Sequence, residues 1–453
     1  MLEKLFKLKQ HNTDVKTEIT AGLTTFMTMA YILAVNPSVL SSAGMDSTAV
    51  LLATCIASFI GTLSIGLMAN LPFALSAGMG LNAYFAYTVV GVYGYSWQTA
   101  LLAVFIEGVV FIVLSLTKIR EAVFNCIPLA LKKAVSVGIG LFICFIGLQN
   151  AGLAVDSATL VTLVDFKESF HTTGICALLA VIGLLAMAIL YIKKVPGSIL
   201  IGIFGTWMLG ILCELTGIYT PDPAAGHYSL IPSFQMTDFS KLGETFGQCF
   251  HVEFDKVGVF NFIVVIFSFL FVDLFDTIGT LIGVSAKADM LDEDGRLEGI
   301  RPALMSDAVA TTAGAVLGTS TVSTFVESAA GVGAGGRTGL TACTTGVLFL
   351  LSMFLAPVFT AIPAFATAPA LILVGFLMFS TVTEIKLDET SYTTAIPAYL
   401  CVAAMPLFYS ISEGIAIGII SFVVINVFCG KAKKVNPLMY VLALLFILKY
   451  IFL

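Results

Sequence analysis

Three carboxylates stand inside strongly apolar sequence and are the residues of this chain that could do chemistry. Asp273 and Asp276 lie in the run 258–284. Glu327 lies in a stretch of hydroxyl-bearing and small residues, 318–340. A charged side chain at the centre of a bilayer costs about 2.5–3.5 kcal/mol, and such residues usually bind a substrate, an ion or a proton. If these runs cross a membrane, the three acids predict a polar site inside it.

The two aspartates belong to the sequence DLFDTIGT, in which Asp273, Asp276, Thr277 and Thr280 follow a helical spacing. Residues three, four and seven positions apart share one face of a helix. Two carboxylates so close together in apolar surroundings cannot both ionise cheaply, so one of them is expected to carry a proton. The pattern predicts a proton site; a helix-packing stripe or a structural hydrogen-bond network is the alternative.

A third polar group, Asn82, follows the glycine-rich piece Ala77–Gly80. Its amide can both donate and accept hydrogen bonds, which suits contact with a ligand. A capping or packing amide is the alternative. Glu107, deeper in another apolar run, has no explanation from the sequence. Asp307 lies close to an expected helix start, where a carboxylate is favoured by the helix dipole.

The glycines of the second polar stretch need a separate interpretation. Gly331, Gly333 and Gly336 spell GxGxxG, and Arg337 stands where the lysine of a P-loop would be. Both nucleotide-binding patterns require a hydrophobic strand before the glycines, and here the preceding run is polar. Small residues also let two backbones approach closely. A helix-packing surface would therefore explain the glycines, but it would not explain Glu327.

Composition identifies the class of protein. The 453 residues are 58% hydrophobic and 11% charged, with a mean hydropathy of +1.01, whereas a soluble domain is about half apolar and a quarter charged. We expect an all-α polytopic membrane protein. The nine cysteines include no CxxC pair and the four histidines lie outside the apolar runs, so we expect no metal site, no disulfide, no cofactor and no enzyme.

Apolar segments of spanning length can be marked along the chain. They lie near 19–36, 48–69, 98–117, 134–151, 174–192, 197–217, 258–284, 302–318, 339–357, 368–383, 393–410 and 412–429. Two shorter glycine-rich pieces, near 72–90 and 319–336, are interpreted as broken segments, which makes fourteen in all. The last apolar stretch, 437–453, cannot be placed.

The distribution of lysine and arginine supports this count. With the N-terminus inside, only Lys167, Lys241 and Lys256 fall in expected outer loops. The other basic residues fall inside, apart from Lys449 in the unplaced stretch, as the positive-inside rule predicts. We therefore expect a multi-pass protein of the cytoplasmic membrane.

A weak internal repeat divides the chain into two halves. Gly61–Gly80 matches Gly314–Gly333 at a constant offset, and Ala77–Gly80 corresponds to Ala330–Gly333. Seven segments per half is an odd number, so the second half enters from the opposite side and the repeat is inverted, as in many secondary transporters. The extended pieces Leu71–Ser76 and Thr319–Val326 occupy corresponding positions, and we expect two short strands that pair with each other.

Three segments resemble signature segments of the AzgA-type purine permeases, a branch of the nucleobase–cation symporters. They are SAGMGLNAYFAYTVV (76–90), DLFDTIGTLIGV (273–284) and GTSTVSTFVESAAGVGAGGRTGL (318–340). The resemblance covers essentially the whole chain and implies a UraA-like fold in two inverted sevens. It also implies proton-coupled uptake of hypoxanthine and guanine, with adenine left open.

The resemblance further implies a division into a core domain and a gate domain. The expected parts are a cytoplasmic N-terminal tail (1–18), the first half of the core (19–117), the first half of the gate (118–217), an extracellular connector (218–256), the second half of the core (257–357), the second half of the gate (358–430), and a basic stretch with an extra apolar segment (431–453).

The family's binding acids in segments 8 and 10 carry over to Asp276 and Glu327, and its segment 3 position to Asn82. The purine is expected to stack near Tyr84 or Phe85. The residues expected to bind it are Glu327, Asp276, Asn82, Gly80, Tyr84, Phe85, Ala329 and Thr277, and the coupled proton is assigned to Asp273, Asp276 or Glu327.

The expected partners are a purine nucleobase, a proton and the lipid bilayer, with no nucleic acid, and a homodimer is left open. A transporter of the same fold for uracil, xanthine or an anion is the alternative function.

Overall fold

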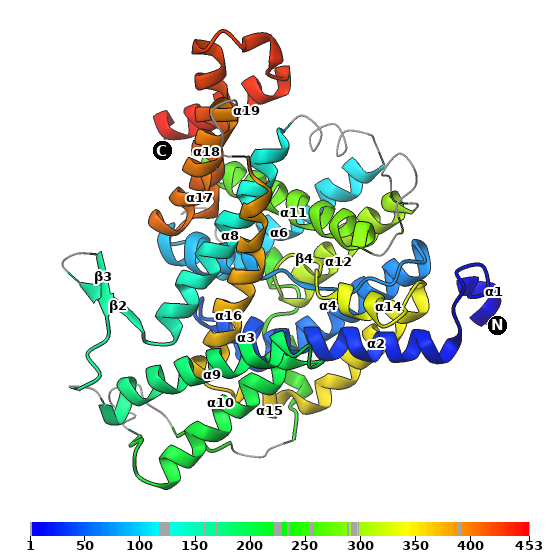
Figure 1. Ribbon diagram of the computed structural model, residues 1–453, viewed down its shortest axis with the longest axis vertical. Coiled ribbons are helices and arrows are strands. Elements are labelled where there is room, and N and C mark those ends of the chain that lie inside the picture. The colour runs from blue at the N-terminus through cyan, green and yellow to red at the C-terminus, as the bar shows by residue number, and fades with distance from the viewer. Residues whose placement is uncertain are drawn as a thin grey trace.

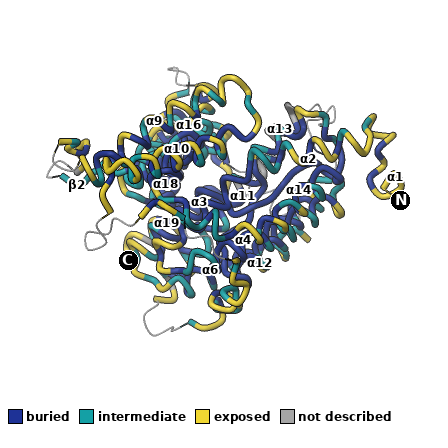
Figure 2. The backbone as a smooth tube through the Cα atoms, turned by 90° about the horizontal axis from the view of Figure 1, so that it is seen from below, coloured by how far each residue is buried: buried dark blue, intermediate teal, exposed yellow. Residues whose placement is uncertain are grey.

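The computed structural model describes residues 2–116, 127–157, 160–167, 170–221, 229–232, 236–252, 258–287, 290, 297, 299–386 and 391–452. It is an assembly of helices that cross in several directions (Figure 1). The backbone is most buried in the middle of the molecule, around α3, and most exposed at the periphery (Figure 2).

The α-helices are α1 (Leu2–Phe6), α2 (Val15–Met29), α3 (Ile32–Ser41), α4 (Ser47–Met68), α5 (Met79–Ala83), α6 (Trp97–Ser115), α8 (Leu129–Asn150), α9 (Ile175–Ile192), α10 (Ser198–Leu215), α11 (Val259–Lys287), α12 (Ile300–Leu317), α13 (Ser328–Gly333), α14 (Gly339–Leu351), α15 (Ala356–Thr360), α16 (Ala364–Phe379), α17 (Tyr392–Leu407), α18 (Ile411–Phe428) and α19 (Pro437–Phe452).

Shorter elements connect them. The strands are β1 (Leu75–Ala77), β2 (Ala154–Ser157), β3 (Leu160–Leu163) and β4 (Val322–Thr324). The π-helical turns are η1 (Tyr84–Val92) and η2 (Phe170–Gly174), and the 3₁₀ turns are η4 (Phe239–Glu244), η5 (Gln248–Phe250), η7 (Ser352–Leu355), η8 (Ser380–Glu384) and η10 (Ala432–Lys434).

Within the described residues, nine helical stretches are long and apolar enough to cross a membrane, and four apolar helices are shorter. Each of the predicted apolar segments contains a helix, so the polytopic helical class is confirmed. The stretch that the sequence could not place forms α19, which packs against α18. The Tyr450 hydroxyl of α19 donates to the Glu413 carboxylate near the start of α18.

The two predicted broken segments each contain a strand, and the strands pair with each other. β1 and β4 are antiparallel, with Ser76 opposite Ser323 at the centre of the pair. Two further backbone bonds extend the ladder: Gly78 N–H donates to Thr321 at 2.9 Å, and Phe325 N–H donates to Ala74 at 3.0 Å. Non-helical backbone buried among helices needs such partners, because an unpaired backbone N–H or C=O group away from solvent costs free energy.

The expected correspondence between Ala77–Gly80 and Ala330–Gly333 is wrong at this point. Ala77 ends strand β1, whereas Ala330 lies inside helix α13. Gly331, next to Ala330, serves packing against α2 instead. A Cβ on Gly331 would lie 1.9 Å from Thr25 Oγ1 and 2.8 Å from the Ala21 carbonyl oxygen. The packing-surface interpretation is thus correct for Gly331, and only glycine permits this close approach.

The sequence did not predict the hairpin between α8 and α9. Strands β2 and β3 pair antiparallel there, with Ala154 opposite Leu163. The hairpin extends away from the helices (Figure 1).

The helices form two groups by their most extensive packing. α4, α6, α12 and α14 pack on one another, and α2 packs on α13 and α14. In the other group α8 packs on α16 and α17, α9 on α10 and α16, and α17 on α18. The antiparallel pair of strands β1 and β4, termed the strand crossing below, belongs to the first group. Strand β1 contacts α4, and β4 contacts α11 and α12.

Glu18 ties the first group together at one end. Helix α2 begins at Val15, inside the stretch predicted as a tail, and Glu18 is fully buried. Its carboxylate accepts from the backbone N–H groups of Arg337 (2.9 Å), Thr338 (3.2 Å) and Thr341 (3.2 Å), and from Thr341 Oγ1 (2.6 Å). A carboxylate from one helix therefore caps the N-terminus of α14.

Replacing Glu18 by alanine is expected to destabilise the protein by about 2–4 kcal/mol, because three backbone donors lose a charged acceptor. The apparent melting temperature of the purified protein in detergent measures this. Glu244→Gln is the control, because Glu244 pairs with Lys241 on the surface and exposed pairs contribute about 0–1 kcal/mol. Equal melting temperatures for the two variants would contradict the capping role.

Candidate functional site

Successive side chains of the segment 319–323 form hydrogen bonds with different helices. Thr319 Oγ1 accepts from Asn36 Nδ2 of α3 at 3.0 Å and lies 3.2 Å from Thr54 Oγ1 of α4. Ser320 donates to Asn82 of α5. All these side chains are fully buried. The segment therefore fixes the relative positions of several helices.

Thr321, the next residue, contacts Glu107, the buried acid for which the sequence gave no explanation. Thr321 Oγ1 donates to Glu107 Oε2 of α6 at 2.7 Å, and both residues are fully buried. Because the Thr321 carbonyl accepts from Gly78 N–H, the Glu107 carboxylate supports the strand crossing through a single residue. A structural role accounts for its position.

Asp276 and Glu327 lie at the strand crossing. Ser323 of β4 donates to Asp276 Oδ2 at 3.2 Å. Tyr31, between α2 and α3, donates to Glu327 Oε1 at 2.7 Å. Both acids are half-buried in surroundings where most side chains are fully buried, and Asp276 lies close enough to Asp307 and to Glu327 for their charges to interact. The structure thus brings together the two acids predicted to bind a ligand.

Asp273 has other hydrogen-bond partners. Thr277 Oγ1 is 3.1 Å from Asp273 Oδ1 and 2.9 Å from Asp307 Oδ1 of α12, and all three residues are fully buried. The expectation that Asp307 lies at a helix start is wrong, because it stands well inside α12. The predicted face of α11 thus contacts two neighbours: Asp276 bonds Ser323 of β4, and Thr277 bonds Asp307 of α12.

Asn82 is the predicted residue that retains an unused donor. It lies in α5 and is fully buried. Its Oδ1 accepts from Ser320, whereas its Nδ2 has no hydrogen-bond partner within the described residues. A buried amide donor without a partner costs about 1–3 kcal/mol, so an acceptor supplied by a ligand would be favourable there.

The other predicted contacts are packed against protein. A Cβ on Gly80 would lie 2.7 Å from Ile139 Cγ2 of α8. Tyr84 and Phe85 are fully buried, and the Tyr84 ring meets Phe269 edge-to-face at 4.9 Å. Ala329 is half-buried in α13. Reaching a ligand from Gly80, Tyr84 or Phe85 would require the helices to move, whereas Ala329 is as accessible as the two acids.

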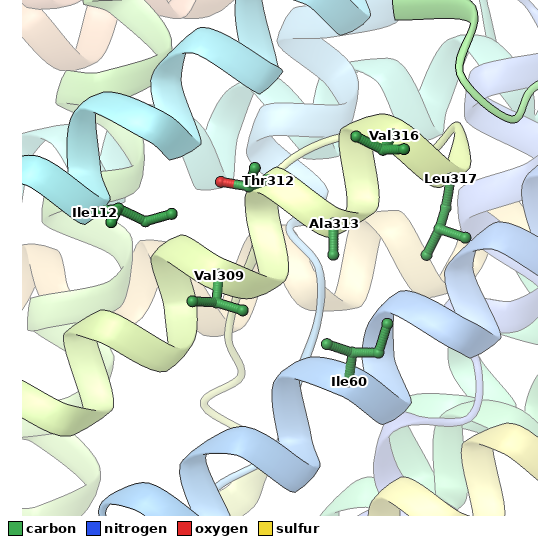
Figure 3. A pocket seen from close by; sticks show the side chains of 7 residues that line it. All are labelled: Ile60, Ile112, Val309, Thr312, Ala313, Val316 and Leu317. Atoms are coloured by element: carbon green, nitrogen blue, oxygen red, sulfur yellow. The ribbon is translucent and has the colours of Figure 1, made fainter.

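Two apolar hollows on the described surface lie away from the acids. One, of about 420 Å³, is formed by α4, α6 and α12 and is lined by Ile60, Ile112, Val309, Thr312, Ala313, Val316 and Leu317 (Figure 3). The other lies between α18 and α19. Neither hollow is lined by Glu327 or Asp276, so the polar site is distinct from both.

The sequence did not predict Tyr31 or Glu18 as functional or supporting residues. Both stand in or next to the first apolar segment, and neither carries a local signal beyond its residue type. A buried tyrosine hydroxyl usually has a hydrogen-bond partner, but the sequence does not identify that partner.

Comparison with known proteins shows extensive similarity. A family described as a permease family matches residues 16–417. The chain is 43% identical to the guanine/hypoxanthine permease PbuO of Bacillus subtilis, over 98% of the chain and 99% of that protein. It is 40% identical to the adenine permease AdeP of Escherichia coli, over 100% of the chain and 96% of that protein.

Among solved structures, the transmembrane domain of the cyanobacterial bicarbonate transporter BicA aligns with a TM-score of 0.62 at 14% identity, covering 89% of this chain and 97% of that one. At this identity the match concerns the fold alone.

Proposed function

The chain belongs to this permease family, and on that premise we propose that it carries purine nucleobases across a membrane as a secondary active transporter. Membership agrees with the resemblance drawn from the three signature segments. It identifies a transporter and not an enzyme. The observation that carries the substrate class is full-length similarity to permeases named for adenine and for guanine and hypoxanthine.

The chemistry of the strand crossing suits a neutral purine. Its ring N–H groups are donors, and Glu327 and Asp276 supply acceptors that are half-exposed. Its ring nitrogens are acceptors, and Asn82 Nδ2 is a donor that has no partner among the residues described in the structure. Two neighbouring acids disfavour an anion, because like charges repel at short range in a low dielectric. The same-fold alternative of anion transport is therefore less well supported by this site.

Coupling to a proton is part of the proposal. A carboxyl group at Glu327, Asp276 or Asp273 would take up the proton with the base and release it inside. One positive charge moved inward gains about 2.3 kcal/mol per 100 mV, which corresponds to about fifty-fold accumulation. Of the three, Asp276 and Glu327 can act on the ligand directly, whereas Asp273 bonds Thr277.

We further propose that the fourteen predicted segments form an inverted repeat, with the N-terminus inside the cytoplasmic membrane. The first packing group then corresponds to a core domain that holds the acids, and the second to a gate domain. Two groups packed mainly within themselves are what a rocking mechanism requires.

Uptake of radiolabelled hypoxanthine, guanine and adenine by proteoliposomes that contain the purified protein tests the proposal. We expect saturable uptake of at least one purine, which the other two purines reduce by competition and which uracil, xanthine and bicarbonate reduce less. A protonophore should abolish accumulation above equilibrium. Uptake that only uracil or bicarbonate reduces would overturn the substrate class, uptake that only xanthine reduces would replace hypoxanthine, guanine and adenine by another purine, and accumulation unaffected by the protonophore would overturn the coupling.

A further inference from the structure

Tyr31 is a fully buried residue at the junction of two helices, and it contacts the proposed site directly. It follows α2 and Ala30 and precedes α3. Its hydroxyl donates to Glu327 Oε1 at 2.7 Å, across 296 residues of sequence. Hydrogen bonds to a charged acceptor are about twice as strong as neutral ones. The contact therefore constrains the Glu327 side chain.

The position of Glu327 in the chain leaves its carboxylate to Tyr31. Glu327 precedes α13 with helical backbone angles, φ -61° and ψ -17°, and its side chain makes no capping hydrogen bond. A side-chain cap requires a residue with non-helical backbone angles. The Ala330 N–H bonds to the Glu327 carbonyl, at 2.9 Å. The side-chain hydrogen bond of this carboxylate is the one from Tyr31.

The carboxylate retains acceptor capacity for a ligand. Oε1 accepts from Tyr31, and a carboxylate has about four acceptor positions on its two oxygens. Glu327 is half-buried, although Tyr31 is not exposed at all. The Tyr31 hydroxyl thus contacts the carboxylate from the buried interior. The exposed part of the Glu327 side chain remains open to a ligand.

We propose that Tyr31 is a positioning residue for the substrate site: its hydroxyl holds Glu327 Oε1 and thereby orients Oε2 toward a ring N–H of the base. This inference rests on the proposed purine transport. Without the hydroxyl, the carboxylate is free to rotate. Part of the binding free energy of the base is then used to order the carboxylate. Binding weakens, whereas the later movement of the helices does not involve the bond.

Tyr31→Phe tests the proposal. We expect the KM for the purine that the unaltered protein transports to rise about tenfold, the equivalent of about 1.4 kcal/mol, with Vmax within about twofold. Tyr93→Phe is the matched control, because the Tyr93 hydroxyl is buried and has no hydrogen-bond partner within the described residues. It should keep the KM of the unaltered protein. An unchanged KM in Tyr31→Phe would overturn the inference.

A second background separates positioning from a general effect on the fold. In Glu327→Ala, which offers the Tyr31 hydroxyl no acceptor, Tyr31→Phe should weaken purine binding less than about twofold, whereas in Asp276→Asn it should keep its full effect. Equal effects in both backgrounds would mean that Tyr31 does not act through Glu327.

Folding is monitored by size-exclusion chromatography. If Tyr31→Phe does not fold, Glu327→Asp replaces it, because the shorter side chain draws the carboxylate away from Tyr31. It should also raise KM, and an unchanged value would reject the idea. If the unaltered protein transports no purine, the proposed function itself fails, which is a different outcome.

Discussion

Glu327→Gln is expected to lower purine uptake at least about 100-fold, which corresponds to about 2.7 kcal/mol. Glutamine has the same shape, and its carbonyl oxygen can still accept from Tyr31. The position of Oε2 becomes an NH₂ group, however, which places a donor against the ring N–H of the base. The loss of a charged acceptor and the unpaired donor that replaces it together account for an effect of this size.

Initial rates of uptake in proteoliposomes, with protein amount matched, measure this prediction. Glu384→Gln is the control, because that acid pairs with Lys133 at 2.7 Å and its side chain is 59% exposed. It should transport like the unaltered protein. If Glu327→Gln stays within about threefold of the unaltered protein, the carboxylate is not the acceptor, and the proposed site is wrong.

Cross-linking α11 to α18 is expected to stop transport. Ser268 of α11 and Ser412 of α18 are buried, and their Oγ atoms lie 2.8 Å apart. In the proposed scheme α11 belongs to the core and α18 to the gate, so this contact must break as the two move. Cysteines at both positions should form a disulfide after small adjustments, because its geometry requires close side chains.

Oxidation of the double variant Ser268→Cys, Ser412→Cys should reduce uptake at least about tenfold, and a reducing agent should restore it. The two single variants and the unaltered protein, treated with the same oxidant, control for the native cysteines. Formation of the cross-link is checked by mass spectrometry. A fully cross-linked protein that transports at the normal rate would show that α11 and α18 do not move apart during the cycle.

The class of the protein and the location of its unusual backbone follow from local sequence. Apolar runs of spanning length predict helices because the period and the composition of a helix are local properties. The pairing of β1 with β4 was also predictable, because interrupted helices inside a membrane leave backbone groups that only another such segment can satisfy. The alignment of the two segments was not predictable. Ala77 and Ala330 match by residue type, yet Ala77 lies in a strand and Ala330 lies in a helix.

Side-chain partners were decided by the tertiary structure. Asp276 and Thr277 share a helical face, but only the packing of α11 against β4 and α12 brings Asp276 to Ser323 and Thr277 to Asp307. Tyr31 reaches Glu327 across 296 residues, and Thr321 reaches Glu107 across 214.

The physical reason is that composition and periodicity are local properties of the sequence, whereas the partners of a buried side chain can be far away along the chain. Composition and periodicity show that a polar group is buried and must therefore be satisfied. They do not show which distant hydroxyl or amide satisfies it, because that depends on how the helices cross. The sequence alone thus determined the type of protein and the acids that its membrane interior holds, and the tertiary structure decided which of them face a common site.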